Sequence, residues 1–147
     1  GLVVIMGTAV FFGEFLTMNL IPQAIASVIL GIVHSKYLLL FIIVIILVLL
    51  GTFMETLSTI MILAPILLPM ITQFGIDPIH FGVLLAMTSA VGMMTPPLGV
   101  NLFVACNITG LSLEKVSMRA IPFILAMLFG IVVVVLFPNL SLFLLQR

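Results

Sequence analysis

Two adjacent prolines, Pro96 and Pro97, interrupt an otherwise apolar segment in the stretch GMMTPPLGVN. A proline in a helix has no N–H for the carbonyl four residues before it, and it pushes the preceding residue out of the helical region. The pair therefore predicts that one helix ends near Met93 or Met94 and that a second starts close behind it. The carbonyls of Gly92 and Met93 are expected to lose their helical partners.

The composition places this break inside a membrane. Of the 147 residues, 65% are hydrophobic and only 5% are charged, whereas soluble domains carry about 25% charged residues. In lipid, an unpaired carbonyl is tolerated only where it is buried in protein or faces a water-filled cavity. A polar site is therefore expected at the break. The net charge of zero argues against a nucleic-acid partner.

The lengths of the apolar segments divide the chain into membrane elements, because a helix needs about 20 apolar residues to cross the hydrocarbon. Residues 1–37 are predicted to form a transmembrane span followed by an arm helix that lies along the interface or packs on a neighbour. Residues 79–110 are predicted to form a discontinuous transmembrane helix, and residues 117–140 the last transmembrane helix. The predicted fold is an all-α integral membrane protein.

Residues 38–72 contain two shorter apolar runs around a polar tip, GTFMETLST. Each run makes about 20 Å of helix, which is too short to cross the hydrocarbon. Length alone also allows one long kinked helix. Glu55 favours a re-entrant hairpin whose tip stops within the membrane, because a carboxylate is costly in lipid and tolerable beside a cavity. Secondary transporters build midplane sites from such broken elements.

The polar connections carry their own signals. Segment 73–78 contains a glycine and an Asp-Pro pair, so it is predicted to be an aqueous turn in which Asp77 caps the next helix. His80 is interpreted as an interfacial side chain. Residues 114–119 are predicted to form a charged loop, and its two basic residues favour the cytoplasmic side.

The proline break also supplies oxygen ligands for a hard cation. Sodium prefers oxygen, and backbone carbonyls and hydroxyls serve without a formal charge. The predicted sodium ligands are the carbonyls of Gly92 and Met93, the Thr95 hydroxyl, and carbonyls at the hairpin tip near Gly51. The alternative is that Thr95 only caps the restarted helix at the Leu98 amide and that Gly92 only permits close packing.

Helix N-termini at the tip and at the break predict a place for an anionic substrate, because they offer amide donors and a favourable dipole. The candidate substrate-binding residues are Thr56 and Ser58 at the tip, Asn101 on the second half-helix, and Thr88 one turn before the break. Asn101 could equally make an interhelical hydrogen bond. No catalytic motif is found, neither His-Glu-x-x-His nor Gly-x-Ser-x-Gly, so an enzyme is not predicted.

Three stretches carry a resemblance to a known family: GTFMETLSTIMILAPILLPMI, GIDPIHFGVLLAMTSAVGMMTPPLGVNLFVA and FPNLSLFLL. Over most of residues 38–144 they resemble the large membrane subunit of tripartite ATP-independent periplasmic (TRAP) transporters, with the sialic-acid and C4-dicarboxylate types both possible. The resemblance implies sodium-driven import of an organic acid across the bacterial inner membrane. A periplasmic binding protein would deliver the acid, and an elevator motion would carry it.

The resemblance also implies partners. Such subunits contain two inverted repeats, each with a hairpin and a broken helix, and this chain resembles the second repeat. Without an initiator Met or a signal-peptide pattern, the sequence is interpreted as a piece of a longer chain. The implied partners are the first repeat, a small membrane subunit, the binding protein and membrane lipid, and the Leu98 backbone becomes a further sodium ligand. The alternative function is a sodium/anion symporter of similar architecture that needs no binding protein.

Overall fold

The computed structural model describes residues 35–54 and 56–143, and before them only positions 7–8, 11–12, 14–16, 18–21, 24, 27–28, 31 and 33. The helices with defined bounds are α3 (Lys36–Gly51), α4 (Thr56–Gln73), α5 (Pro78–Met93), α6 (Val100–Thr109), α7 (Leu113–Leu136) and α8 (Asn139–Leu142). The described residues contain no strand, in agreement with the all-α prediction. About half of residues 1–37, the predicted span and arm helix, lie outside the described residues, and Glu55 lies outside them as well.

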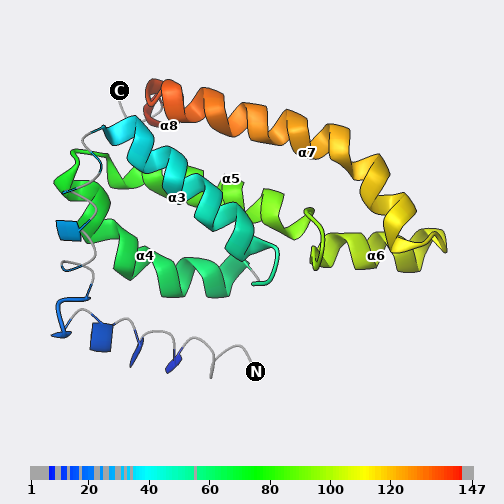
Figure 1. Cartoon of the computed structure of the whole chain (residues 1–147), viewed down its shortest axis with the longest axis horizontal. Helices are drawn as coiled ribbons and strands as arrows, with labels where there is room; N and C mark the ends of the chain where they lie inside the picture. Colours follow the sequence, from blue (N-terminus) through cyan, green and yellow to red (C-terminus); the bar gives the residue numbers. More distant parts are fainter. Residues whose placement is uncertain are drawn as a thin grey trace.

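The chain reverses direction between α3 and α4 (Figure 1). Two separate helices therefore occupy the range in which the sequence also allowed one long kinked helix. With 16 and 18 residues, the two arms are about 24 and 27 Å long, longer than expected because α4 begins directly at Thr56 and continues to Gln73. By length and composition α4 could cross a membrane, so arm length alone does not make the hairpin re-entrant.

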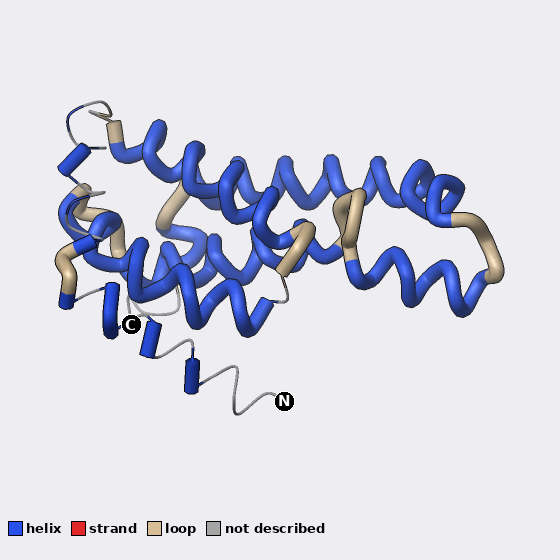
Figure 2. The backbone as a smooth tube through the Cα atoms, turned by 60° about the horizontal axis from the view of Figure 1, so that its bottom comes forward, coloured by secondary structure: helices blue, strands red, loops and turns tan. Residues whose placement is uncertain are grey.

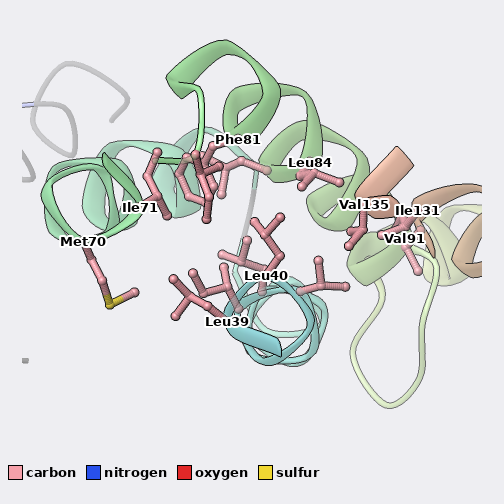
Figure 3. Close-up of a cluster of buried hydrophobic side chains, with 14 of the residues drawn as sticks. Leu39, Leu40, Met70, Ile71, Phe81, Leu84, Val91, Ile131 and Val135 are labelled. Atoms are coloured by element: carbon pink, nitrogen blue, oxygen red, sulfur yellow. The ribbon is translucent and has the colours of Figure 1, made fainter. Parts of the chain in front are cut away.

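Helices α3 and α5 form the centre of the core, and each contributes a stripe of buried residues at i, i+4 spacing. The stripe on α3 consists of Leu39, Leu40, Ile43, Val44, Leu47 and Gly51. The stripe on α5 consists of His80, Phe81, Leu84, Leu85, Thr88, Ser89, Val91 and Gly92. Figure 3 shows how α4 and α7 complete the cluster with Met70, Ile71, Ile131 and Val135.

The buried residues of α5 become smaller toward its C-terminal end, from Phe81 and Leu84 to Thr88, Ser89 and Gly92. Small residues let two helix backbones approach each other closely. The end of α3 can therefore touch α5 directly at this point.

Helix α7 packs against both α5 and α6 and runs alongside the two halves of the discontinuous helix (Figures 1 and 2). Its 24 residues make about 36 Å of helix, enough to cross the hydrocarbon. The α3–α4 turn and the α5–α6 break lie side by side, partway along α7 (Figure 1). The two helix interruptions therefore lie at about the same position along α7.

Two segments, 73–78 and 114–119, were predicted to be non-helical connections, and only the first is one. Segment 73–78 is a turn, as predicted, with Gly75 at a φ of 68° and with the next helix beginning at Pro78. The predicted charged loop 114–119 is wrong, because α7 already begins at Leu113. An acidic residue in the first turn of a helix suits the positive end of its dipole, so the charges are compatible with helix.

Candidate functional site

The hairpin tip and the break after α5 meet at two glycines. A Cβ added to Gly92 would lie 2.5 Å from the carbonyl carbon of Gly51 and 2.6 Å from its Cα. No side chain can occupy such a position, so the two backbones are in direct contact. The structure thus brings together the two segments that the sequence assigned to one site, and the ion-binding role stays a prediction.

The last turn of α5 tightens before the chain breaks. The Met94 N–H donates to the Val91 carbonyl at 3.1 Å, and the Thr95 N–H donates to the Gly92 carbonyl at 2.9 Å. The expectation that the Gly92 carbonyl is left without a partner is therefore wrong, because a tighter turn replaces the bond that Pro96 cannot make. A carbonyl oxygen has two lone pairs, so this group keeps the capacity to contact an ion.

The Thr95 side chain turns back onto α5. Its hydroxyl donates to the Val91 carbonyl at 2.7 Å. It does not cap the Leu98 amide, because α6 begins only at Val100 and has Gly99 in its N-cap position. The half-buried hydroxyl oxygen retains lone pairs at the break, whereas Leu98 has an exposed side chain in the connecting turn.

Gly99 folds back onto the end of α5, where two carbonyl oxygens lie close to it. Its N–H donates to the Thr95 carbonyl at 3.2 Å. A Cβ at Gly99 would lie 2.7 Å from the Met93 carbonyl oxygen and 2.8 Å from the Thr95 carbonyl oxygen, so only a glycine can approach them this closely. Main-chain oxygens of this kind are the ligand type that hard cations prefer. Within the described residues no backbone N–H donates to the Met93 carbonyl, since Pro97 has none to offer.

Gly99 is not among the residues predicted from the sequence. The available signal was its position two residues after the proline pair, where the chain has to turn back for a new helix to begin. A glycine lets the backbone come close to other main-chain atoms without a steric clash. Gly99 is therefore added to the residues that shape the break.

The predicted substrate-binding residues divide into two groups. Thr56, at the start of α4, reaches the break, where its hydroxyl donates to the Met93 sulfur at 2.9 Å. Ser58 is half-buried near the same helix end, and Asn101 is exposed in the first turn of α6. Thr88 is fully buried, and its hydroxyl donates to two carbonyls of its own helix at 2.8 and 3.0 Å. In this conformation the Thr88 donor is committed to α5.

Met93 is the point at which three helix ends converge. It is the last residue of α5, its sulfur contacts the first residue of α4, and its carbonyl faces Gly99, the residue before α6. The C-terminal end of α5 is the negative end of its dipole, and the beginnings of α4 and α6 are positive ends. One helix end that favours cations therefore lies beside two that favour anions.

A second polar cluster lies at the other end of α5. The side chain of His80 is 2% exposed, its Nδ1 lies 2.9 Å from the Ser141 hydroxyl of α8, and its buried Nε2 has no hydrogen-bond partner among the described residues. A cavity of about 140 Å³ beside it is lined in part by Lys36 and Asp77. His80 is therefore buried beneath α8, and its position at the membrane interface stays a prediction.

Comparisons with known proteins point to one family. The family model described as "Tripartite ATP-independent periplasmic transporter, DctM component" matches residues 1–140. The chain is 39% identical over 141 residues to the isethionate TRAP transporter permease protein DctMQ of Oleidesulfovibrio alaskensis, which covers 96% of the chain and 22% of that relative.

Two further relatives carry similar names. The chain is 38% identical to the C4-dicarboxylate TRAP transporter large permease protein DctM of Pseudomonas aeruginosa, over 96% of the chain and 33% of the relative. It is 32% identical to the sialic acid TRAP transporter large permease protein SiaM of Vibrio cholerae, over 95% of the chain and 33% of the relative. The chain thus spans about a third of these relatives, or less.

Proposed function

The chain belongs to the DctM-component family of TRAP transporters, and we propose that it forms the C-terminal part of a large permease subunit in a bacterial inner membrane. The whole transporter imports an organic acid together with sodium, after a periplasmic binding protein has delivered the acid. The chain's relatives are named TRAP permeases, which favours this class over a sodium/anion symporter without a binding protein. The partners in this proposal are the remainder of the large subunit, a small membrane subunit, the binding protein and membrane lipid.

The geometry supports a re-entrant hairpin within this proposal. In a membrane crossed by α7, the tip between α3 and α4 stops partway across, because it lies beside the α5–α6 break (Figure 1). Helices α3, α4, α5 and α7 share one buried core, so they can move together as a body in an elevator motion. This hairpin and the broken helix form the second of the two inverted repeats.

The ion and the substrate occupy neighbouring positions at the break. Sodium is held by main-chain oxygens around Met93 and the tip, with the Thr95 hydroxyl at the edge. The complete proposed set comprises Gly51, Gly92, Met93, Thr95 and the Leu98 backbone. The acid group of the substrate lies between the beginnings of α4 and α6, near Thr56, Ser58 and Asn101, while Thr88 supports the site from within α5. Isethionate, C4-dicarboxylates and sialic acid, for which the relatives are named, are all organic anions.

The contact between Gly51 and Gly92 carries the proposal, and Gly92→Ala tests it. The intact transporter, with its small subunit and binding protein, is reconstituted into liposomes, and uptake of isethionate, succinate and sialic acid is measured with and without a sodium gradient. We expect sodium-dependent uptake of at least one acid. We expect Gly92→Ala to reduce it at least about tenfold, because the new methyl group pushes the tip away from the break.

Gly82→Ala is the matched control. Gly82 lies on the same helix as Gly92, but a Cβ there meets no other part of the protein within 4 Å. It should transport at the normal rate. Equal uptake with and without sodium would exclude the coupling. Normal uptake by a correctly assembled Gly92→Ala transporter would exclude the tip–break contact as part of the site.

A further inference from the structure

Met93 contacts the proposed ion position with its main chain and the proposed substrate position with its side chain. Its carbonyl oxygen lies close to Gly99, as does the Thr95 carbonyl oxygen. Its sulfur accepts the Thr56 hydroxyl at 2.9 Å. The two residues are far apart in sequence and belong to different helices, so this hydrogen bond links α4 to the end of α5.

The Thr56 hydroxyl is held by a weak acceptor. A thioether sulfur accepts hydrogen bonds poorly, whereas the oxygen of an ionised acid forms shorter and stronger bonds. The sulfur therefore orients the hydroxyl in the empty site without competing strongly against an arriving anion. A leucine of similar volume would fill the same space but could not orient the hydroxyl.

The carbonyl and the side chain of Met93 are attached to one Cα, and the preceding residue, Gly92, is held against Gly51. A reorientation of the Met93 backbone therefore acts at a restrained point. It can reach the Thr56 hydroxyl through the sulfur that accepts its hydrogen bond.

We propose that Met93 is the positioning residue that couples sodium binding to substrate binding, through its carbonyl on one side and its thioether contact with Thr56 on the other. The inference rests on the proposed function, and it assigns to one residue the link between sodium and the substrate. Coupling is reciprocal, so sodium raises the affinity for the acid by the same factor as the acid raises the affinity for sodium. Breaking the contact between Met93 and Thr56 lowers that factor.

The experiment measures the coupling factor in the intact transporter, reconstituted with its partners. The probe is whichever of isethionate, succinate or sialic acid the wild type takes up, and its half-saturating concentration is determined at low and at saturating sodium. The ratio of the two values is the coupling factor. We expect Met93→Leu and Thr56→Val each to lower this ratio at least about threefold, since allosteric coupling commonly amounts to about 5- to 150-fold.

Conservative variants separate hydrogen bonding from packing. Met93→Gln places an amide oxygen near the sulfur position, and Thr56→Ser keeps the hydroxyl, so both should retain most of the coupling. The double variant Met93→Leu/Thr56→Val should lose no more than either single variant, because both remove the same contact. Met94→Leu is the matched control. Its side chain packs against the core cluster, and the ratio should stay at the wild-type value.

Two results would overturn the inference: a wild-type ratio in correctly assembled Met93→Leu, or additive losses in the double variant. A wild-type transporter that takes up none of the acids in response to sodium would contradict the proposed function instead. The two failures are therefore distinguishable.

Discussion

Helix α5 ends in two different ways. At its N-terminal end, the Asp77 carboxylate accepts the Ile79 and His80 amides at 2.7 and 3.3 Å, so side-chain oxygen replaces the missing helical acceptors. At its C-terminal end, carbonyls face Gly51 and Gly99 through main-chain contacts. The N-terminal end is thus a closed end, because side-chain oxygen pairs with its amides. The C-terminal end is an open end, because it presents backbone oxygens to neighbouring segments.

Proline has opposite effects at the two ends. Pro78 occupies the first turn of α5, where its missing N–H costs no helical bond. Pro96 and Pro97 follow the last turn, where each missing N–H removes a donor from a carbonyl of α5. Changes at the closed end should therefore affect stability, and changes at the open end should affect transport.

Replacing Pro96 and Pro97 together by alanine should have the largest effect. Residues 96 and 97 regain N–H groups, and the Met93 carbonyl acquires a helical donor in place of an ion. A continuous helix is favoured because an interior proline opposes a helix by about 3 kcal/mol. We expect a folded, membrane-inserted transporter whose sodium-dependent uptake is abolished, measured in proteoliposomes.

Pro78→Ala is the control for that experiment, because it removes a proline from the other end of the same helix. Its uptake should remain near the wild-type value. If the double variant accumulates substrate with normal sodium dependence, the open end of α5 is not the ion site.

His80→Ala tests the closed end and should have an intermediate effect. The side chain is buried, so its removal leaves a cavity and deletes the bond to Ser141. We expect the free energy of unfolding to fall by about 2 kcal/mol or more, measured by denaturant titration in detergent micelles. Ser141→Ala removes only the hydrogen bond and should cost about 1 kcal/mol. A shift in the sodium concentration that half-activates uptake, in a variant that is still folded, would contradict the separation between the two ends.

Asp77→Ala should have the smallest effect. Loss of a helix N-cap typically costs about 1 kcal/mol, and the thermal midpoint of the purified transporter should fall accordingly. Asp77→Asn retains an oxygen that can accept the same amides and should stay closer to the wild type. Sodium-dependent uptake should persist in both variants, and its loss in a stable Asp77→Ala protein would give this end a direct part in transport.

Local features of the site could be predicted from sequence. The end of α5 at Met93, the turn at 73–78 and the capping role of Asp77 all depend on residues within a few positions of one another. Proline lacks a donor in any context, and an Asp before a helix finds amides two and three residues ahead. Such signals are therefore readable without the fold.

Other predictions failed because they depended on context. The charges at 114–119 suggested a loop, but helix tolerates charged residues in its first turns, so α7 begins at Leu113. The alternative role of Thr95, as a cap of the next helix, is wrong as well, because its hydroxyl donates back to the Val91 carbonyl. In both cases the same residues are compatible with several local conformations, and tertiary packing determines which one forms.

Residue types alone make this chain helical and apolar, and they interrupt its helices at a polar tip and at a proline pair. The contacts of Gly51 with Gly92, of Thr56 with Met93 and of Ser141 with His80 follow only from the packed fold. The two kinds of feature differ in the range of the interactions behind them. Hydropathy, proline and capping act over one or two helical turns, whereas a contact between distant segments depends on how all the intervening helices pack.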